Sequence, residues 1–277
     1  MNLFQAAILG AIEGLTEFLP VSSTGHLILA GHAMGLVGPV MNDFEIVIQA
    51  GALLAVLWLY RARVAGVLAG VARPRSPGGR LLLKLLVAFL PAAVVGLAFH
   101  HVIQERLFGP LPVAAALFLG GVVMVIFERW RRAHGVAPVF ASVDEIPLGV
   151  ALAIGSFQCL SLWPGVSRAM VTILAGLLLG CSAVAAAEFS FLLALPTLGA
   201  ATLFDLVKSR EALLSGATVG LAATLVGLSV AAIVAVIAIR SFLRYLTRHG
   251  LEPFGWYRIA LGLALLVLIW RTHGGSP

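Results

Sequence analysis

Residues 13–26 read EGLTEFLPVSSTGH and place two glutamates, several hydroxyl side chains and a histidine inside the first apolar segment of the chain. Hydrophobic residues make up 61% of the 277 residues and charged residues only 11%, and the mean hydropathy is +1.06. A charged side chain at the depth of a bilayer is costly, so it usually serves a function. This stretch therefore predicts a break in the first membrane segment and a functional site beside it.

The composition predicts an all-α, polytopic integral membrane protein, because helices satisfy their own backbone groups in lipid. A soluble chain of this length would have to hide more apolar surface than a single core accepts. The net charge of +6 does not indicate nucleic acid, since the basic residues cluster in short connections without interleaved aromatic residues. Cys159 and Cys181 lie in apolar stretches, so we expect small core residues and no disulfide.

Ten apolar segments can be read along the chain, at about 3–20, 26–41, 44–60, 81–99, 111–127, 147–163, 170–181, 186–204, 216–239 and 256–270. A full crossing of a bilayer takes about 20 residues. Residues 26–41 are interrupted by glycines and a histidine, and residues 170–181 are too short to cross. Short or interrupted segments at corresponding positions of two halves predict re-entrant helices beside a binding site.

The lysines and arginines predict the orientation of the chain. None of the 18 precedes Arg61. Most of them fall in or near residues 61–80, 128–146 and 240–255, and we count Arg258 with the last of these stretches. The positive-inside rule places these three connections in the cytoplasm and both termini outside.

The two halves of the chain resemble each other. FLPVSS at 18–23 is followed by DFEIVIQAGALLAV at 43–56, and LWPGVSR at 162–168 is followed by AEFSFLLALPTLGAA at 187–201. The charge pattern makes the segments that follow the two motifs cross in opposite directions. This opposition indicates an inverted-topology repeat with two re-entrant helix-loop-helix segments.

The repeat suggests how the chain is divided. We predict a single membrane domain over residues 1–277, in which repeat one covers about 1–127 and repeat two about 147–270. A cytoplasmic linker, about 128–146, joins them.

Glu13 and Glu17 are four residues apart and therefore share one face of a helix. Two carboxylates side by side in a low dielectric repel each other, and a divalent cation removes the conflict. Mg²⁺ and Ca²⁺ take oxygen ligands, and Mg²⁺ often uses one or two carboxylates plus substrate phosphates. The pair predicts a cation site, and the alternative is a pair of protonated glutamates that hydrogen-bond neighbouring helices.

Pro20 is expected to end the first helix, and a hydroxyl-rich turn follows before a helix that starts near His26. An N-cap uses one hydroxyl, so Ser22, Ser23 and Thr24 together supply more hydroxyls than capping requires. In isolation His26 would be a core histidine with satisfied hydrogen bonds. Beside serines and carboxylates it becomes a candidate proton-transfer group.

The second motif, WPGVSRAMVT, occupies residues 163–172 and is broken at Gly165. Ser167 and Arg168 follow at the start of a short helix, whose N-terminus favours anions. Arg168 is the only basic residue in its apolar surroundings, and its planar fork suits phosphate oxygens. The alternative is a structural ion pair with Glu188 or with one of the first-half glutamates.

Combined across the two halves, these groups suit phosphoryl chemistry, in which catalysis is mainly positioning and charge neutralisation. Their burial among apolar helices favours a substrate with a phosphate head and an apolar tail.

The motifs EGLTEFLPVSSTGH, PGVSR with the later Thr172, and AAEFSFLLALP together resemble the undecaprenyl-diphosphate phosphatase family, also called bacitracin-resistance proteins. The resemblance spans nearly the whole chain. It implies a hydrolase in the bacterial inner (cytoplasmic) membrane that converts undecaprenyl diphosphate to undecaprenyl phosphate plus phosphate. That reaction recycles the lipid carrier of cell-wall synthesis and confers bacitracin resistance.

The resemblance also implies a divalent cation, Mg²⁺ or Ca²⁺, and a site open to the periplasmic face. Carried over by matching positions, the catalytic group is Glu17, Ser23, His26 and Arg168. The substrate-binding group is Ser22, Thr24, Gly165, Ser167 and Thr172, and the metal ligands are Glu13 and Glu17. The nucleophile is Ser23, with His26 as its proton partner, or a water that His26 activates.

One departure from the family pattern lies in the second motif, where Ala169 and Met170 replace the usual Ser-Gly. We expect this change to alter the second bend without removing activity. A rival function is a transporter or flippase of polyprenyl phosphate lipids, because inverted repeats with broken helices are also a transporter architecture. A scaffold whose polar residues only join helices would not need the whole first motif. The sequence leaves the oligomeric state open, with a homodimer among the arrangements considered.

Overall fold

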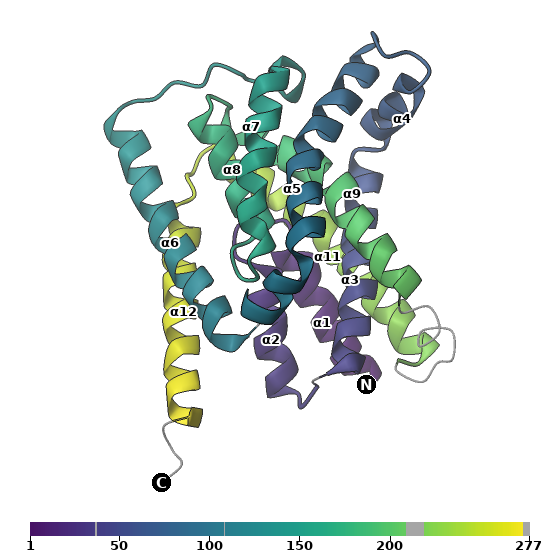
Figure 1. The fold of residues 1–277 in the computed structure, drawn as a ribbon, viewed down its shortest axis with the longest axis vertical. Coiled ribbons are helices and arrows are strands. Elements are labelled where there is room, and N and C mark those ends of the chain that lie inside the picture. Colours follow the sequence, from purple (N-terminus) through teal and green to yellow (C-terminus); the bar gives the residue numbers. More distant parts are fainter. Residues whose placement is uncertain (37, 108, 209–218, 274–277) are drawn as a thin grey trace.

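The structure, a computed structural model, describes residues 1–36, 38–107, 109–208 and 219–273 (Figure 1). The helices are α1 (Leu3–Thr16), α2 (Ser23–Ala33), α3 (Pro39–Leu59), α4 (Arg61–Gly70), α5 (Pro77–Leu107), α6 (Pro110–Ala133), α7 (Leu148–Gln158), α8 (Arg168–Leu178), α9 (Ala183–Lys208), α11 (Leu221–Leu246) and α12 (Glu252–His273), with short 3-10 turns η1 (Val143–Glu145) and η2 (Cys159–Leu162). These residues contain no β-strand, and one isolated bridge pairs Phe140 with Cys181. The prediction of an all-α fold is confirmed.

Six helices within the described residues are long and apolar enough to cross a membrane: Met41–Leu59, Pro77–Phe99, Pro110–Ala133, Ala183–Phe204, Leu221–Leu246 and Glu252–Arg271. The chain is therefore a multi-pass membrane protein, as predicted. Each of the ten predicted apolar segments overlaps a helix. Residue 37 and residues 216–218, which belong to two of those segments, lie outside the described residues.

The predicted connections contain more helix than expected. The stretch 61–80, expected as a plain connection, holds the whole of α4 and the start of α5, and α6 and α11 extend into the other two basic stretches. No proline interrupts residues 61–70, and a single interior glycine, Gly66, is tolerated in a helix. Arg63 of α4 also forms an ion pair of 3.2 Å with Asp144, which ties α4 to η1.

Two pairs of short helices carry the predicted motifs. In the first pair, α1 ends at Thr16 and α2 begins at Ser23, so residues 17–22 form the first bend. In the second pair, η2 extends α7 and α8 begins at Arg168, so residues 163–167 form the second bend. An 11-residue helix such as α2 is only about 16 Å long, which is shorter than the hydrocarbon core of about 30 Å.

The two pairs lie toward opposite ends of the molecule (Figure 1). α1 and α2 lie toward the end that holds both termini, whereas α7 and α8 lie toward the end that holds α4. This arrangement agrees with the charge pattern, which assigned the termini and the stretch 61–80 to opposite sides. The re-entrant placement of the pairs in a bilayer and the limits of the two repeats stay predictions.

The helices of the two halves interlock. α1 and α3 pack on α11, α7 packs on α5, and α6 packs on α12. Gly10 of α1 lies directly against the Gly227 carbonyl of α11, and Gly155 of α7 lies against the Ala88 carbonyl of α5. Small residues of this kind let helix backbones approach closely. Gly10 and Gly155 are 145 residues apart, the same offset that relates Ser22 to Ser167.

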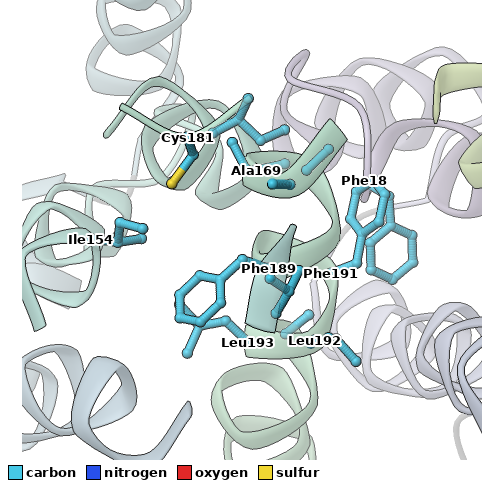
Figure 2. Packing of buried hydrophobic residues seen from close by; sticks show 14 of the residues in the cluster. Phe18, Ile154, Ala169, Cys181, Phe189, Phe191, Leu192 and Leu193 are labelled. Atoms are coloured by element: carbon cyan, nitrogen blue, oxygen red, sulfur yellow. The ribbon is translucent and has the colours of Figure 1, made fainter. Parts of the chain in front are cut away.

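The main core lies where the first bend meets α8 and α9 (Figure 2). Phe18 packs edge-on against Phe191 of α9, with ring centroids 5.6 Å apart. Both cysteines are free thiols, and burial raises the pKa of Cys181 to about 11. Cys181 is thus a small core residue, as the sequence indicated. The core holds the two bends against each other, and the polar residues lie at that junction.

Candidate active site

The two bends lead into their helices through the same unusual backbone conformation. Ser22 has φ 71° and ψ 101°, Ser167 has φ 70° and ψ 113°, and they are the only non-glycine residues with positive φ in the part of the chain that the structure describes. Such conformations cost about 1–3 kcal/mol each and concentrate at functional sites. Both bends thus share a backbone conformation that is typical of functional sites.

The hydroxyls of these two serines cap the helices that follow. Ser22 Oγ accepts a hydrogen bond from the Gly25 N–H at 3.5 Å, and Ser167 Oγ accepts one from the Met170 N–H at 3.3 Å. The structure therefore gives Ser22 and Ser167, predicted to bind substrate, a capping role. The caps orient the next residue of each helix, which is Ser23 in one half and Arg168 in the other.

Glu17 joins those two residues across the halves. Arg168 Nη2 donates to Glu17 Oε1 at 3.1 Å, and Ser23 Oγ donates to Glu17 Oε2 at 2.7 Å. The side chains of Glu17 and Arg168 are each only 7% exposed, so this is a buried ion pair. Arg168 pairs with Glu17, not with Glu188, whose charged neighbours are Arg63 and Asp144.

The Arg168 guanidinium also hydrogen-bonds to Ser190 of α9, through its other terminal nitrogen. Its Nη1 donates to the Ser190 carbonyl at 2.8 Å and to Ser190 Oγ at 3.3 Å. The Thr172 hydroxyl lies 2.8 Å from the Arg168 carbonyl, to which it donates, and 2.7 Å from Ser190 Oγ. Phe18 adds a cation–π contact, with its ring centroid 5.7 Å from the guanidinium carbon. Thr172, predicted to bind substrate, is placed to fix Arg168.

His26 is held by α12. Its Nδ1 lies 2.7 Å from the Ser22 carbonyl, so Nδ1 carries the proton, and Nε2 accepts from the Tyr257 hydroxyl at 2.6 Å. The two rings also stack with centroids 5.6 Å apart. The predicted Ser23–His26 relay is not assembled in this arrangement, because Ser23 donates to Glu17 instead.

The acidic groups exceed the basic ones at this site. Glu13, 2% exposed, interacts electrostatically with Glu17, Glu45 and Arg168. In ionised form, the three carboxylates carry three negative charges, and Arg168 supplies one positive charge among the neighbours of Glu13. Among the described residues no three Asp, Glu, His or Cys side chains are grouped as a metal site. Glu13 and Glu17 could offer carboxylate oxygens, which are the ligand type that Mg²⁺ and Ca²⁺ take.

The remaining predicted residues have distinct environments. Thr24 is half-buried at the start of α2. Gly165 has φ 95°, and a Cβ there would meet the Val113 carbonyl at 2.7 Å, so the second bend needs glycine. Ala169 and Met170, the departure from the family pattern, are buried in the core beneath Arg168. Apolar packing takes the place of the usual Ser-Gly.

Sequence reasoning missed three residues that shape the site: Ser190, Tyr257 and Arg258. Arg258 was assigned to the cytoplasmic basic group, and the structure corrects this, because it is fully buried and donates to the Pro20 and Gly165 carbonyls. The available signal was a charged residue inside the apolar segment 256–270. No comparable signal distinguished the two hydroxyl residues.

Comparison with known proteins gives consistent matches along the chain. The family model described as bacitracin resistance protein BacA matches residues 6–264. An undecaprenyl-diphosphatase of Sorangium cellulosum is 56% identical over 270 residues, covering 97% of this chain and 87% of the relative. Undecaprenyl-diphosphatase 2 of Rhodospirillum rubrum is 49% identical, covering 97% and 95%. An undecaprenyl-diphosphatase of Ectopseudomonas mendocina is 46% identical, covering 98% and 95%.

Proposed function

Because this chain belongs to the bacitracin resistance protein BacA family, we propose that it is an undecaprenyl-diphosphatase. It hydrolyses undecaprenyl diphosphate to undecaprenyl phosphate and phosphate, and so recycles a lipid carrier of cell-wall synthesis. The observation that carries the proposal is the position of Glu17, which accepts from Ser23 on one side and from Arg168 on the other. In the proposed reaction Ser23 is the nucleophile, Glu17 is the base, and the Arg168 guanidinium binds phosphate.

The first chemical step follows from the hydrogen bond between Ser23 and Glu17. Ser23 Oγ attacks the terminal phosphorus, its proton passes to Glu17 Oε2, and the bridging P–O bond breaks. Undecaprenyl phosphate leaves, and the terminal phosphoryl group stays on Ser23 as a phosphoserine. Glu17 lies at 2.7 Å from Oγ, which is within the range expected of a general base.

The second step releases phosphate. Water attacks the phosphoserine phosphorus and the P–Oγ bond breaks. Glu17 returns its proton to Ser23 Oγ, and both protons of the water leave with the product as dihydrogen phosphate. In both steps Arg168 stabilises the charge that develops on the phosphoryl oxygens. The Ser190 and Thr172 contacts keep its fork oriented for that task.

A divalent cation would be held by Glu13 and Glu17 together with diphosphate oxygens. When bound, it neutralises phosphate charge and polarises the bond to be broken. The excess of carboxylates around Glu13 supports this assignment.

We place the protein in the bacterial cytoplasmic membrane with its site open to the periplasmic face, on the basis of the basic connections. The apolar tail of the substrate would lie in the surrounding lipid. Both bends come from one chain, so the site is complete in a protomer whether or not two copies form a homodimer. A pure flippase would move intact lipid without releasing phosphate, and the names of the relatives favour hydrolysis.

The proposed activity predicts metal-dependent phosphate release. Purified protein in detergent should release phosphate from a polyprenyl diphosphate, and EDTA should lower the rate by about 100-fold, because loss of the cation removes several kcal/mol of charge stabilisation. Adding Mg²⁺ or Ca²⁺ in excess should restore it. A rate unaffected by EDTA would exclude the cation, and no release under any condition would exclude the hydrolase.

The nucleophile is tested by replacing Ser23. Ser23→Ala should lower turnover by about 100-fold, since it removes the attacking oxygen. Acid-quenched wild-type protein should carry a phosphoserine at position 23 by mass spectrometry. Full activity of Ser23→Ala would instead assign the attack to water activated by His26. Ser156→Ala serves as the control, because it removes an exposed hydroxyl that donates to the Leu152 carbonyl of its own helix.

A further inference from the structure

Arg258 is a charged residue for which the proposed reaction has no use, yet it is 0% exposed. Its guanidinium donates three hydrogen bonds, all to backbone carbonyls. Nη1 reaches Pro20 at 3.4 Å, and Nη2 reaches Ala116 at 3.2 Å and Gly165 at 3.0 Å. One side chain of α12 therefore binds the first bend, the second bend and α6.

Both bends depend on such a donor. The backbone carbonyls in a bend lack the N–H partners that they would have inside a helix. A buried carbonyl without a hydrogen-bond donor destabilises the fold. Pro20 and Gly165 lie within the two bends that interrupt the helices of the two halves. A single planar group that donates to both carbonyls fixes how far apart the bends lie.

The surrounding packing is shaped to admit this guanidinium. Gly120 of α6 lies so close to Arg258 Nη2 that a Cβ on Gly120 would collide with it. The Met170 sulfur borders the same position, at 3.1 Å from where that Cβ would be. The glycine in α6 thus makes room for Arg258, and the methionine that departs from the family pattern lines its side.

The charge of Arg258 is not explained by an ion pair. Its hydrogen bonds in the described part of the chain all go to carbonyl oxygens. Burying a cation without a carboxylate is unfavourable compared with an apolar side chain of similar volume. An apolar residue would fill this space without the free-energy cost of burying a charge. It could not, however, donate hydrogen bonds to the two bends and fix their separation. Holding them is therefore the property that requires arginine.

We propose that Arg258 is a positioning residue that sets the separation of the two bends. That separation determines whether Ser23 and Glu17 of the first half face Arg168 of the second. The inference rests on the proposed function, because the consequence of misplacement is measured in turnover. Arg258 itself contacts neither Glu17 nor Arg168 through any of its three hydrogen bonds.

The test compares Arg258→Lys and Arg258→Met with wild type. Phosphate release from a polyprenyl diphosphate is measured per folded molecule, with the folded fraction taken from size-exclusion chromatography and a melting curve. Both variants should lose about 100-fold in kcat, the effect expected of a misplacement of about 1 Å, with KM changed by no more than a few-fold. Arg258→Lys should not restore kcat, since one ammonium cannot donate to three carbonyls in the way that the planar guanidinium does.

The control is Arg129→Met, which removes an exposed arginine that pairs with Glu252 and should leave kcat unchanged. Near-normal kcat in Arg258→Lys would show that charge alone suffices and would overturn the proposal. Failure of both Arg258 variants to fold would also overturn it, because the residue would then serve the fold and not the spacing. An inactive wild type would count against the proposed function instead.

Discussion

Arg168→Ala is expected to reduce phosphate release by about 10⁴-fold. Removing an arginine that stabilises a phosphoryl transition state costs about 10³–10⁵ in kcat. The change also leaves Glu17 buried without its partner, and breaking a buried ion pair costs about 3–5 kcal/mol of stability. The melting temperature should therefore fall as well. Turnover is measured per folded molecule so that the two effects are separated.

Arg168→Lys distinguishes loss of charge from loss of geometry. Lysine keeps the charge, but it cannot donate to Glu17 on one side and to Ser190 on the other, as the two Arg168 nitrogens do. We expect it to remain about 100-fold below wild type while regaining most of the stability. Turnover near wild type in either variant would remove Arg168 from the catalytic group.

Glu17→Gln is expected to lower phosphate release by about 10³-fold. The amide keeps the volume of the carboxylate but can neither take the Ser23 proton nor supply a negative oxygen to the cation. Purified Glu17→Gln protein, assayed over a series of Mg²⁺ concentrations, should show no recovery at high metal. Recovery to the wild-type rate would limit Glu17 to a metal-affinity role and would contradict its assignment as the base.

Glu128→Gln is the matched control for that variant. Glu128 is also a buried glutamate paired with an arginine, Arg131, at 2.9 Å. It lies beside Gly250, in a part of the molecule that the proposed reaction does not use. We expect Glu128→Gln to lose some stability and to keep its turnover per folded molecule.

Much of the fold could be predicted because each membrane helix corresponds to an apolar run that is continuous in the sequence. A long apolar run predicts a crossing wherever it lies, and all ten runs overlapped helices. The first helix nevertheless ended at Thr16 instead of continuing to Pro20. The limits of the helices were less predictable. α4 forms inside a stretch expected as a plain connection, and α6 and α11 continue into the basic stretches that follow their apolar runs.

The site was predictable where polar residues cluster in one motif, as with Glu17, Ser23 and Arg168. The neighbouring residues Ser190, Tyr257 and Arg258 were not predicted, because each stands singly in an apolar helix. Only Arg258 carried a signal, as a charge in an apolar segment, and its hydrogen-bond partners depend on the fold. The charge count misassigned Arg258 for this reason. The roles of the capping serines were also hidden, because a hydroxyl that caps a helix and one that binds phosphate look identical in the sequence.

In the proposed reaction, one phosphate is bound by groups from both bends. The most direct measurement is an experimental structure of the protein with Mg²⁺ and a methylene-bridged analogue of a polyprenyl diphosphate. Oxygens of the terminal phosphate should lie within hydrogen-bond distance of the Arg168 guanidinium, with Ser23 Oγ facing the phosphorus and the metal on Glu13 and Glu17. A diphosphonate bound by one bend alone, or away from the Glu17–Arg168 pair, would contradict the account.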